Sequence, residues 1–399
     1  MYPRHAARLV SVLILFVWLL TACRGALPIN TSIKIGAIHD LTGATSVVGI
    51  PYAEGMRDYV GWLNAQGGVD GRTVELISAD YAYDVDTAKK LYSWMVDQGV
   101  VAFMGWGTGD TEALRPRLAV DRIPFMSASY SADLGDIRQF PYNFLVGVTY
   151  SEQAMIAMRW ALDDWQRAGN AGAPKIALAY HDSPFGESPL RDAEAYADAN
   201  GIKLLTIRLP NTASDYLPEL EQIKAYGADY VIVHTVSSPA AVLLKEAESQ
   251  GFKPDLKFIC LNWCADEAFI QLAGQAAEDV IGAIPFAPPG LRAAGHKDAA
   301  AWLAENGASL DEKGLHYTQG WWTMAVMLEG VRRVVNGGQE VTRENLKAAL
   351  ETIQDFNTGG VTAPISFSPT SHTGNHALRL YQVHDGKWKL ISDTISSDR

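Results

Sequence analysis

Short apolar runs alternate with amphipathic stretches along most of this chain. In the first third, the apolar runs predict strands and the amphipathic stretches between them predict helices. The strands are Ile33–Ile38, Thr73–Ala79, Val100–Met104 and Ile123–Met126, and the helices are Tyr52–Gln66, Asp86–Gln98 and Thr111–Asp121. Such alternation is typical of an open, mainly parallel sheet covered by helices, so we expect one doubly wound α/β lobe here.

The same pattern restarts at Ser151 and predicts a second lobe of the same architecture. Its strands are Lys175–Tyr180, Ile202–Arg208, Tyr230–His234 and Lys257–Leu261, and its helices are Ser151–Ala168, Ser188–Asn200, Asp215–Tyr226 and Pro239–Gln250. Later helices are predicted at Asp298–Asn306, Leu315–Asn336 and Arg343–Thr352, the last capped by Thr342. The final segment alternates as antiparallel strands do, which predicts Ile365–Phe367, Ala377–Val383 and Trp388–Ile391.

The N-terminal segment has a pattern of its own. Arg4 and Arg8 precede an apolar run from Leu9 to Leu20, and small residues and Cys23 follow it. The run is too short to span a bilayer core of ~30 Å as a mature helix. We interpret residues 1–22 as a lipoprotein signal peptide and Cys23 as the lipid attachment site, with an uncleaved anchor as the alternative. On either interpretation the remaining chain is exported and anchored to a membrane.

Composition narrows the possible functions. The formal net charge is −12, and loss of Arg4 and Arg8 with the leader moves it to about −14, so a nucleic acid is not an expected partner. Outside the cytoplasm, Cys260 and Cys264 predict either a disulfide or two free buried thiols. A CxxxC pair alone is a weak metal signal, because zinc needs further ligands. We therefore expect no metal and no cofactor.

Several short stretches in combination resemble one known family. They are Ile33–Gly36, Asp40–Gly43 and Leu63–Arg72, followed by a strand that ends near Asp80 and Asp84. Together with the order of elements over nearly the whole mature chain, they are similar to the branched-chain amino acid (Leu/Ile/Val) type of periplasmic solute-binding protein of ABC transporters. The resemblance implies a type I periplasmic-binding fold, with two doubly wound parallel-sheet lobes joined by three hinge crossings. It places lobe one at residues 30–147 plus 283–357 and lobe two at 148–282 plus 358–399.

The expected ligand-binding residues lie in loops after strands, because open α/β sheets bind ligands beyond the carboxyl ends of their strands. The resemblance implies that Thr108 and Ser129 offer hydroxyl groups and that Phe185 lies over the ligand. The complete predicted set is Trp106, Gly107, Thr108, Ala128, Ser129, Tyr130, Phe185, Val236 and Trp263. Tight turns, a helix cap or core packing are the alternative roles for these residues.

Two positions depart from the amino acid binders of this family. Val236 stands where they have an aromatic residue, and Trp263 stands where they have an acid for the ligand ammonium. A buried ammonium without a carboxylate loses most of its pairing energy, so a standard α-amino acid is disfavoured unless Asp266 takes that place through a three-residue alignment shift. The aromatic residues of the set predict a cleft that suits a flat ring or a quaternary ammonium.

Other chemistries have less support. Gly105, Gly107 and Gly109 do not form a dinucleotide fingerprint, because Asp110 stands where GxGxxG requires glycine. His181, Asp182 and Ser183 include triad residue types but are sequence neighbours, and no GxSxG is present.

We therefore expect a monomeric, non-enzymatic protein that captures a small polar or aromatic organic solute between its lobes by hinge closure. The solute would be amino-acid-like, an aromatic acid or an amide, and the protein would deliver it to an ABC permease. A sensory ligand-binding subunit for a membrane receptor or kinase is the alternative, and an exported hydrolase is a remote one.

Overall fold

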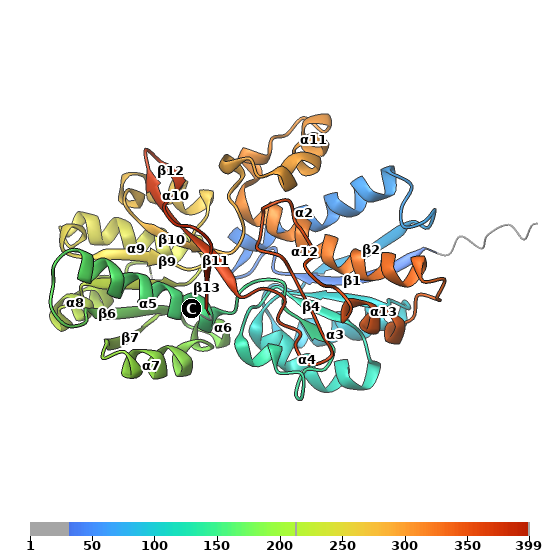
Figure 1. The fold of residues 1–399 in the computed structure, drawn as a ribbon, viewed down its shortest axis with the longest axis horizontal. Helices are drawn as coiled ribbons and strands as arrows, with labels where there is room; N and C mark the ends of the chain where they lie inside the picture. Colours follow the sequence, from blue (N-terminus) through green and yellow to red (C-terminus); the bar gives the residue numbers. More distant parts are fainter. Residues whose placement is uncertain (1–31, 212–213, 398–399) are drawn as a thin grey trace, which may run out of the picture.

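A computed structural model describes residues 32–211 and 214–397 and arranges them in two lobes, each built on one β-sheet (Figure 1). The predicted signal peptide at residues 1–22 and the predicted lipid attachment site Cys23 lie outside the described residues. Within the described ranges, no helix combines the length and the apolar character needed to cross a bilayer.

The first lobe contains a five-stranded parallel sheet in the order β2-β1-β3-β4-β5. Its strands are β1 (Ile33–His39), β2 (Val74–Asp80), β3 (Ala102–Gly105), β4 (Phe125–Ser127) and β5 (Asn143–Phe144). Its helices are α2 (Ser46–Ala65), α3 (Val85–Asp97), α4 (Thr108–Asp121) and the late α11 (Lys297–Glu305), α12 (Leu310–Asn336) and α13 (Arg343–Leu350). The long α12 lies against α2, so the late part of the chain returns to the first lobe (Figure 1).

The second lobe contains an eight-stranded sheet in the order β12-β11-β10-β9-β8-β6-β7, with β13 paired to β11. The parallel strands are β6 (Lys175–His181), β7 (Lys203–Leu209), β8 (Tyr230–His234), β9 (Lys257–Cys260) and β10 (Ile281–Ile284). The antiparallel strands are β11 (Ala377–His384), β12 (Lys387–Leu390) and β13 (Ile395–Ser396). The helices are α5 (Tyr150–Arg167), α6 (Pro184–Glu187), α7 (Leu190–Ala199), α8 (Leu217–Tyr226), α9 (Ser237–Ser249) and α10 (Glu267–Ala273).

The predicted architecture of two doubly wound, mainly parallel lobes is confirmed. Several local predictions differ from the structure. Helix α2 begins at Ser46 instead of Tyr52 and α4 at Thr108 instead of Thr111, and β5, α6, α10, β10 and β13 have no counterpart among the predicted elements. The predicted strand Ile365–Phe367 is wrong, because Ile365 forms only an isolated bridge with Phe356. The cap on α13 is as predicted, since Thr342 Oγ1 accepts a hydrogen bond from Asn345 N at 3.2 Å.

The chain passes between the lobes after β5, after β10 and before β11. The third passage comes later than residue 358, where we expected lobe two to resume. Apolar Phe367 packs on Phe144 of the first lobe at a ring distance of 5.2 Å, and Thr373 pairs with Leu145. These contacts keep the segment from residue 358 to about residue 375 with the first lobe. The second passage also shifts, because β10 ends at Ile284 within the second sheet.

Candidate functional site

A cavity lies between the lobes, at the carboxyl ends of strands from both sheets. It is lined by Thr45, Val48, Tyr83, Trp106, Gly107, Thr108, Ala128, Ser129, Tyr150, Phe185, Val236 and Trp263. In this closed arrangement the cavity measures only ≈ 20 Å³, about the room that one water molecule needs. A larger solute therefore has to enter while the lobes are apart, and side chains of both lobes fill most of the closed cleft.

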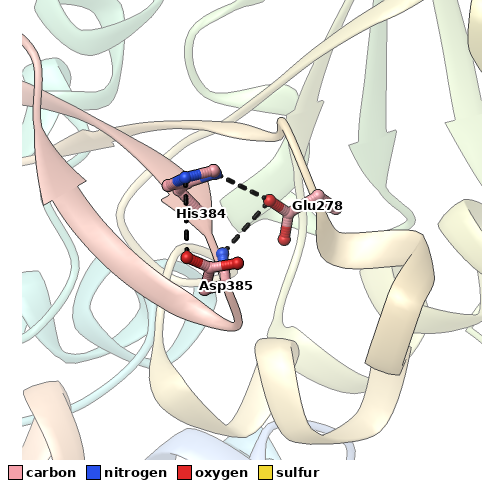
Figure 2. A group of neighbouring side chains, drawn as sticks. All are labelled: Glu278, His384 and Asp385. Carbon is pink, nitrogen blue, oxygen red and sulfur yellow. Dashed lines mark hydrogen bonds and ion pairs between the residues drawn. The ribbon is translucent and has the colours of Figure 1, made fainter.

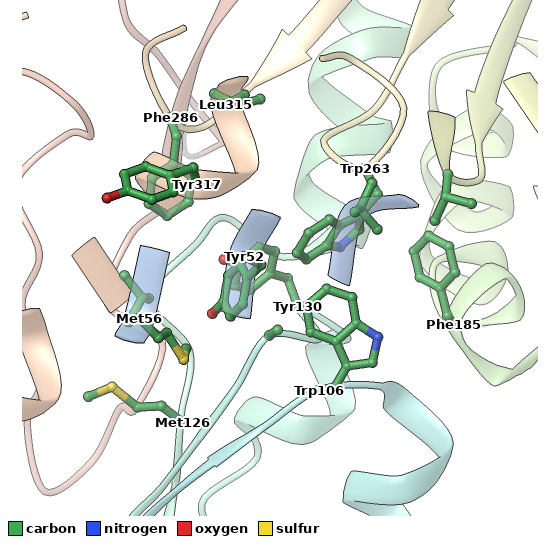
Figure 3. Packing of buried hydrophobic residues seen from close by; sticks show 14 of the residues in the cluster. Tyr52, Met56, Trp106, Met126, Tyr130, Phe185, Trp263, Phe286, Leu315 and Tyr317 are labelled. Atoms are coloured by element: carbon green, nitrogen blue, oxygen red, sulfur yellow. The ribbon is translucent and has the colours of Figure 1, made fainter. Parts of the chain in front are cut away.

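Eight of the nine predicted ligand-binding residues line this cavity, and Tyr130 does not. Tyr130 is fully buried next to it, with its ring stacked on Trp263 at 6.1 Å and its hydroxyl accepting a hydrogen bond from Gln319 Nε2 at 2.7 Å. The bond to α12 turns this side chain into the first lobe. Tyr130 therefore supports a lining residue and is not one itself (Figure 3).

Four lining residues were not predicted from the sequence. Thr45 follows β1 and Tyr83 follows β2, so the rule that ligands bind beyond strand ends would have nominated both if it had been applied to these two strands. Val48 lies in the first turn of α2, and Tyr150 is the first residue of α5. Nothing in the local sequence marks these two, because they reach the cavity through the tertiary arrangement.

The polar side chains of the lining bond mainly to one another. Thr108 Oγ1 lies 2.6 Å from Ser129 Oγ, Trp106 Nε1 donates to Thr45 Oγ1 at 2.9 Å, and Trp263 Nε1 donates to the Tyr150 hydroxyl at 2.7 Å. None of the lining residues, all of which belong to the described part of the chain, carries a formal charge. The cavity therefore presents aromatic faces and hydroxyl groups to a ligand.

Several helices begin at the cavity, among them α4 and α9. The N-cap of α4 is Gly107, whose amide donates to the first-turn carboxylate of Asp110 at 3.1 Å, and the N-cap of α9 is Val236; in the described chain neither N-cap residue caps its helix with a side chain. Free amides and the helix dipole favour a negatively charged or hydrogen-bond-accepting group at such a position. The sequence Gly-Thr-Gly at 107–109 thus places the Thr108 hydroxyl within an amide-rich corner.

Three buried carboxylates lie directly behind the lining. Asp40 Oδ2 accepts from Thr45 Oγ1 at 2.7 Å, Asp110 Oδ2 accepts from Gly107 N at 3.1 Å, and Asp266 Oδ2 accepts from Ser237 Oγ at 2.5 Å. Burial raises the pKa of Asp110 to about 7. Asp266 also caps α10 through the Phe269 amide, and it does not line the cavity. The structure thus gives no support to the alignment shift that would bring Asp266 to a ligand ammonium.

Trp263 and the residues after it join the two lobes. The Trp263 ring lies 5.3 Å from the Trp106 ring of the first lobe (Figure 3). It also lies 4.9 Å from the His316 ring, which belongs to the first lobe as well. His316 Nε2 lies 2.9 Å from Asp266 Oδ2, and Leu315 N donates to Glu267 Oε2 at 2.7 Å. Leu315 follows Gly314, whose φ of 76° interrupts α12, so Glu267 of lobe two caps the second segment of this lobe-one helix.

This cap predicts that lobe closure takes up a proton. Burial raises the pKa of Glu267 from 4.5 to about 7 in the closed protein, and opening would return the carboxylate to water. Closure is therefore favoured as the pH falls through 7, and solute affinity should rise by at most about tenfold per pH unit, the limit for one proton. Isothermal titration between pH 8 and 5.5 measures this rise, and Glu267→Gln should flatten it.

The other titratable groups that face Glu267 are the Asp266 carboxylate and the His316 imidazole, and Lys313 nearby pairs with Glu54 at 2.7 Å. His316→Gln is the matched variant, since it leaves Glu267 and its cap in place. If the pH dependence persists in Glu267→Gln and disappears in His316→Gln, Glu267 is not the proton acceptor.

The possible disulfide is not formed. Cys260 and Cys264 are free, buried thiols, and Cys264 Sγ donates to the Val233 carbonyl oxygen at 3.1 Å. The bond directs this sulfur toward β8. The structure therefore agrees with the second alternative, two free buried thiols.

The neighbours His181, Asp182 and Ser183 do not assemble a catalytic triad. His181 Nδ1 lies 2.8 Å from Ser183 Oγ, but the Asp182 carboxylate pairs with Arg208 at 3.1 Å. Burial lowers the pKa of His181 to about 4. The arrangement lacks the carboxylate that orients the base in such triads, so the hydrolase alternative gains no support.

A group of possible metal ligands lies at the surface, away from the cavity. Glu278, His384 and Asp385 meet at the turn between β11 and β12, where Glu278 Oε1 lies 3.0 Å from His384 Nδ1 (Figure 2). His384 and Asp385 are exposed, and the side chains already pair with one another. Exposed groups of this kind are common without an ion, so we assign no metal site here.

Fold and cavity together define a class: two-lobed α/β proteins that enclose a small molecule between hinged domains. A family model described as periplasmic binding protein matches residues 32–387. The chain therefore belongs to the periplasmic binding protein family, and the expected resemblance to its Leu/Ile/Val type is confirmed. This family consists of ligand binders without enzymatic activity, as we expected.

Individual relatives agree with this membership. The Leu/Ile/Val-binding protein homolog 7 of Brucella abortus (strain 2308) is 26% identical over 243 residues, which cover 58% of this chain and 59% of the relative. The match thus spans about three fifths of the relative's length. The structure of a branched chain amino acid ABC transporter from Thermus thermophilus with bound valine has a TM-score of 0.86 at 24% identity, covering 92% and 97% of the chains. An ABC transporter substrate binding protein from Aeropyrum pernix has a TM-score of 0.82 at 29% identity, covering 92% and 96%.

Proposed function

We propose that the protein is the lipid-anchored solute-binding protein of an ABC importer. It captures a small polar or aromatic organic solute, either amino-acid-like, an aromatic acid or an amide, and delivers it to the permease. The observation that carries this proposal is the cavity formed jointly by the strand ends of both lobes, whose lining includes hydroxyl groups, the starts of α4 and α9, and aromatic rings. The names of the Brucella and Thermus relatives point to the same kind of activity.

Binding would proceed by hinge closure, because each lobe supplies only part of the lining. A solute that contacts both lobes stabilises the closed state and shifts the population toward it. Isothermal titration of the purified protein against amino acids, aromatic acids, amides and betaines tests the binding. Small-angle scattering with and without the tight ligand tests the closure. If no small molecule binds and a macromolecule does, the transport function is wrong.

Replacing Thr108 by valine should weaken solute binding about tenfold, because one hydroxyl that bonds a polar ligand group is lost while the volume stays nearly the same. Thr235→Val is the matched control, since the Thr235 hydroxyl is buried without a partner and does not line the cavity. Isothermal titration of both variants measures the difference. Equal affinities for the two variants would assign Thr108 to helix capping and packing instead of binding.

The proposed lipid anchor has a test of its own. Cells grown with labelled palmitate should incorporate the label into the wild-type protein, and Cys23→Ala should lose the label, because the variant lacks the thiol that carries the lipid. Cys260→Ala serves as the control for thiol loss elsewhere. A labelled Cys23→Ala variant would place the anchor at another residue.

A further inference from the structure

The aromatic residues of the lining form a group of rings that we call the aromatic cage. Its members, contributed by both lobes, are Tyr83, Trp106, Tyr150, Phe185 and Trp263. The Trp106 and Trp263 rings meet at 58° with centroids 5.3 Å apart, and the Tyr150 and Phe185 rings meet at 67° with centroids 5.2 Å apart. Rings that meet at such angles form a corner and not two parallel plates. A corner of this kind suits a rounded cation better than a flat ring.

Several hydroxyls around the cage already have hydrogen-bond partners in the protein. The hydroxyls of Thr108 and Ser129 bond to each other, and that of Thr45 bonds to Asp40 and Trp106. A primary ammonium has three N–H donors, and each one left unpaired in a buried site costs binding free energy. A quaternary ammonium has no N–H donor and avoids this cost.

Negative charge lies close to the cage without touching its interior. Asp40 is bonded behind Thr45, and Asp266 is bonded behind Ser237, next to the lining residue Val236. Both carboxylates are buried and already accept hydrogen bonds from the protein. They can attract a cation through space, but they are not available for a direct salt bridge. This combination favours a cation that needs no hydrogen-bond partner.

The opposite character is found at the start of α4. Gly107 provides no side-chain cap, the first-turn carboxylate of Asp110 accepts from the Gly107 amide at 3.1 Å, and the hydroxyls of Thr108 and Ser129 lie beside this helix start. Amides at a helix start bind carboxylates well. One side of the cavity therefore suits an anion, and the aromatic side suits a cation without N–H groups.

We propose that the cleft binds a small quaternary ammonium carboxylate, a solute of the betaine class, with its methylated nitrogen in the aromatic cage and its carboxylate at the start of α4. This inference rests on the proposed function and specifies its solute. It also gives Trp263 a role that a carboxylate in the same place could not have, since the indole face attracts the cation without accepting a hydrogen bond.

A methylation series tests the proposal on the purified full chain by isothermal titration. The probes are glycine, N-methylglycine, N,N-dimethylglycine and glycine betaine, with 3,3-dimethylbutanoate as the uncharged-head isostere of betaine. Affinity should rise with each methyl group, and betaine should bind at least about tenfold tighter than the isostere, which has the same shape but no cation–π attraction. A flat aromatic acid, benzoate, and L-valine are included as competitors.

A pair of variants separates the ring from the indole N–H. Trp106→Phe and Trp106→Leu both lose the hydrogen bond to Thr45, but only the phenylalanine keeps an aromatic face. Betaine affinity should therefore be at least about fivefold lower in Trp106→Leu than in Trp106→Phe, while 3,3-dimethylbutanoate should bind the two equally. Equal betaine affinities in the two variants would contradict the cage.

The outcomes distinguish this inference from the function on which it rests. Tighter binding of 3,3-dimethylbutanoate, benzoate, glycine or L-valine than of betaine would overturn the betaine assignment and leave a solute-binding protein. The betaine assignment is also wrong, and the solute-binding function remains, if none of these probes binds and another of the amino acids, aromatic acids or amides tested under the proposed function does. If no small molecule of either set binds, both the inference and the proposed function fail.

Discussion

Replacing Gly320 by alanine will lower the free energy of unfolding by about 3 kcal/mol or more, the upper end of the usual cost of overpacking a core. Gly320 lies in α12 where this helix crosses α2, and a Cβ atom there would come within 2.0 Å of the Tyr52 carbonyl oxygen. The contact is reciprocal, because a Cβ atom on Gly55 would lie 2.0 Å from the Tyr317 carbonyl oxygen. Backbone atoms cannot rotate away, so the two helices would have to separate.

Urea unfolding of the ligand-free protein, followed by circular dichroism and tryptophan fluorescence, measures this loss as a lower midpoint. Gly290→Ala is the control, since a Cβ atom there has no neighbour within 4 Å and the backbone φ is not positive. A Gly320→Ala protein with the midpoint of Gly290→Ala would mean that α2 and α12 do not approach this closely.

The alternation of apolar and amphipathic segments predicts both parallel sheets because strands buried on two faces are continuous apolar runs. The same signal misleads at Ile365–Phe367, where the apolar side chains are buried by a loop that packs on Phe144 and not by strand pairing. The sequence also does not reveal that Gly55 and Gly320 lie at a close helix crossing. From the sequence, a glycine inside a helix only indicates a lower helix stability. Its role in close packing becomes clear once the neighbouring helix is known.

The residues of the site also differ in how far the sequence could predict them. Residues directly after β3, β4, β6, β8 and β9 could be nominated from strand order alone, because parallel strands turn their carboxyl ends to one edge. The contacts between the lobes could not be predicted from strand order. Asp266 meets His316 and Glu267 meets the Leu315 amide only because two segments about fifty residues apart are brought together by closure of the lobes. No local pattern in either segment specifies the other.

Replacing Trp263 by alanine will weaken solute binding at least tenfold, which corresponds to ~1.4 kcal/mol. Trp263 belongs to the second lobe, yet its ring contacts Trp106, Tyr130 and His316 of the first lobe. Its Nε1 also donates to the Tyr150 hydroxyl at 2.7 Å. Truncation therefore removes a wall of the cavity and a contact that forms only on closure, so the closed complex loses more than the open protein does.

Isothermal titration gives the affinities, and thermal unfolding without ligand gives the stabilities. Trp263→Phe should recover part of the affinity, because it restores an aromatic face without the bond to Tyr150. Trp388→Ala is the opposite control, since Trp388 packs on Phe269 in the second lobe and does not line the cavity. It should lower stability and leave affinity unchanged. If Trp263→Ala behaves like Trp388→Ala in both measurements, Trp263 is a core residue and the solute binds elsewhere in the cleft.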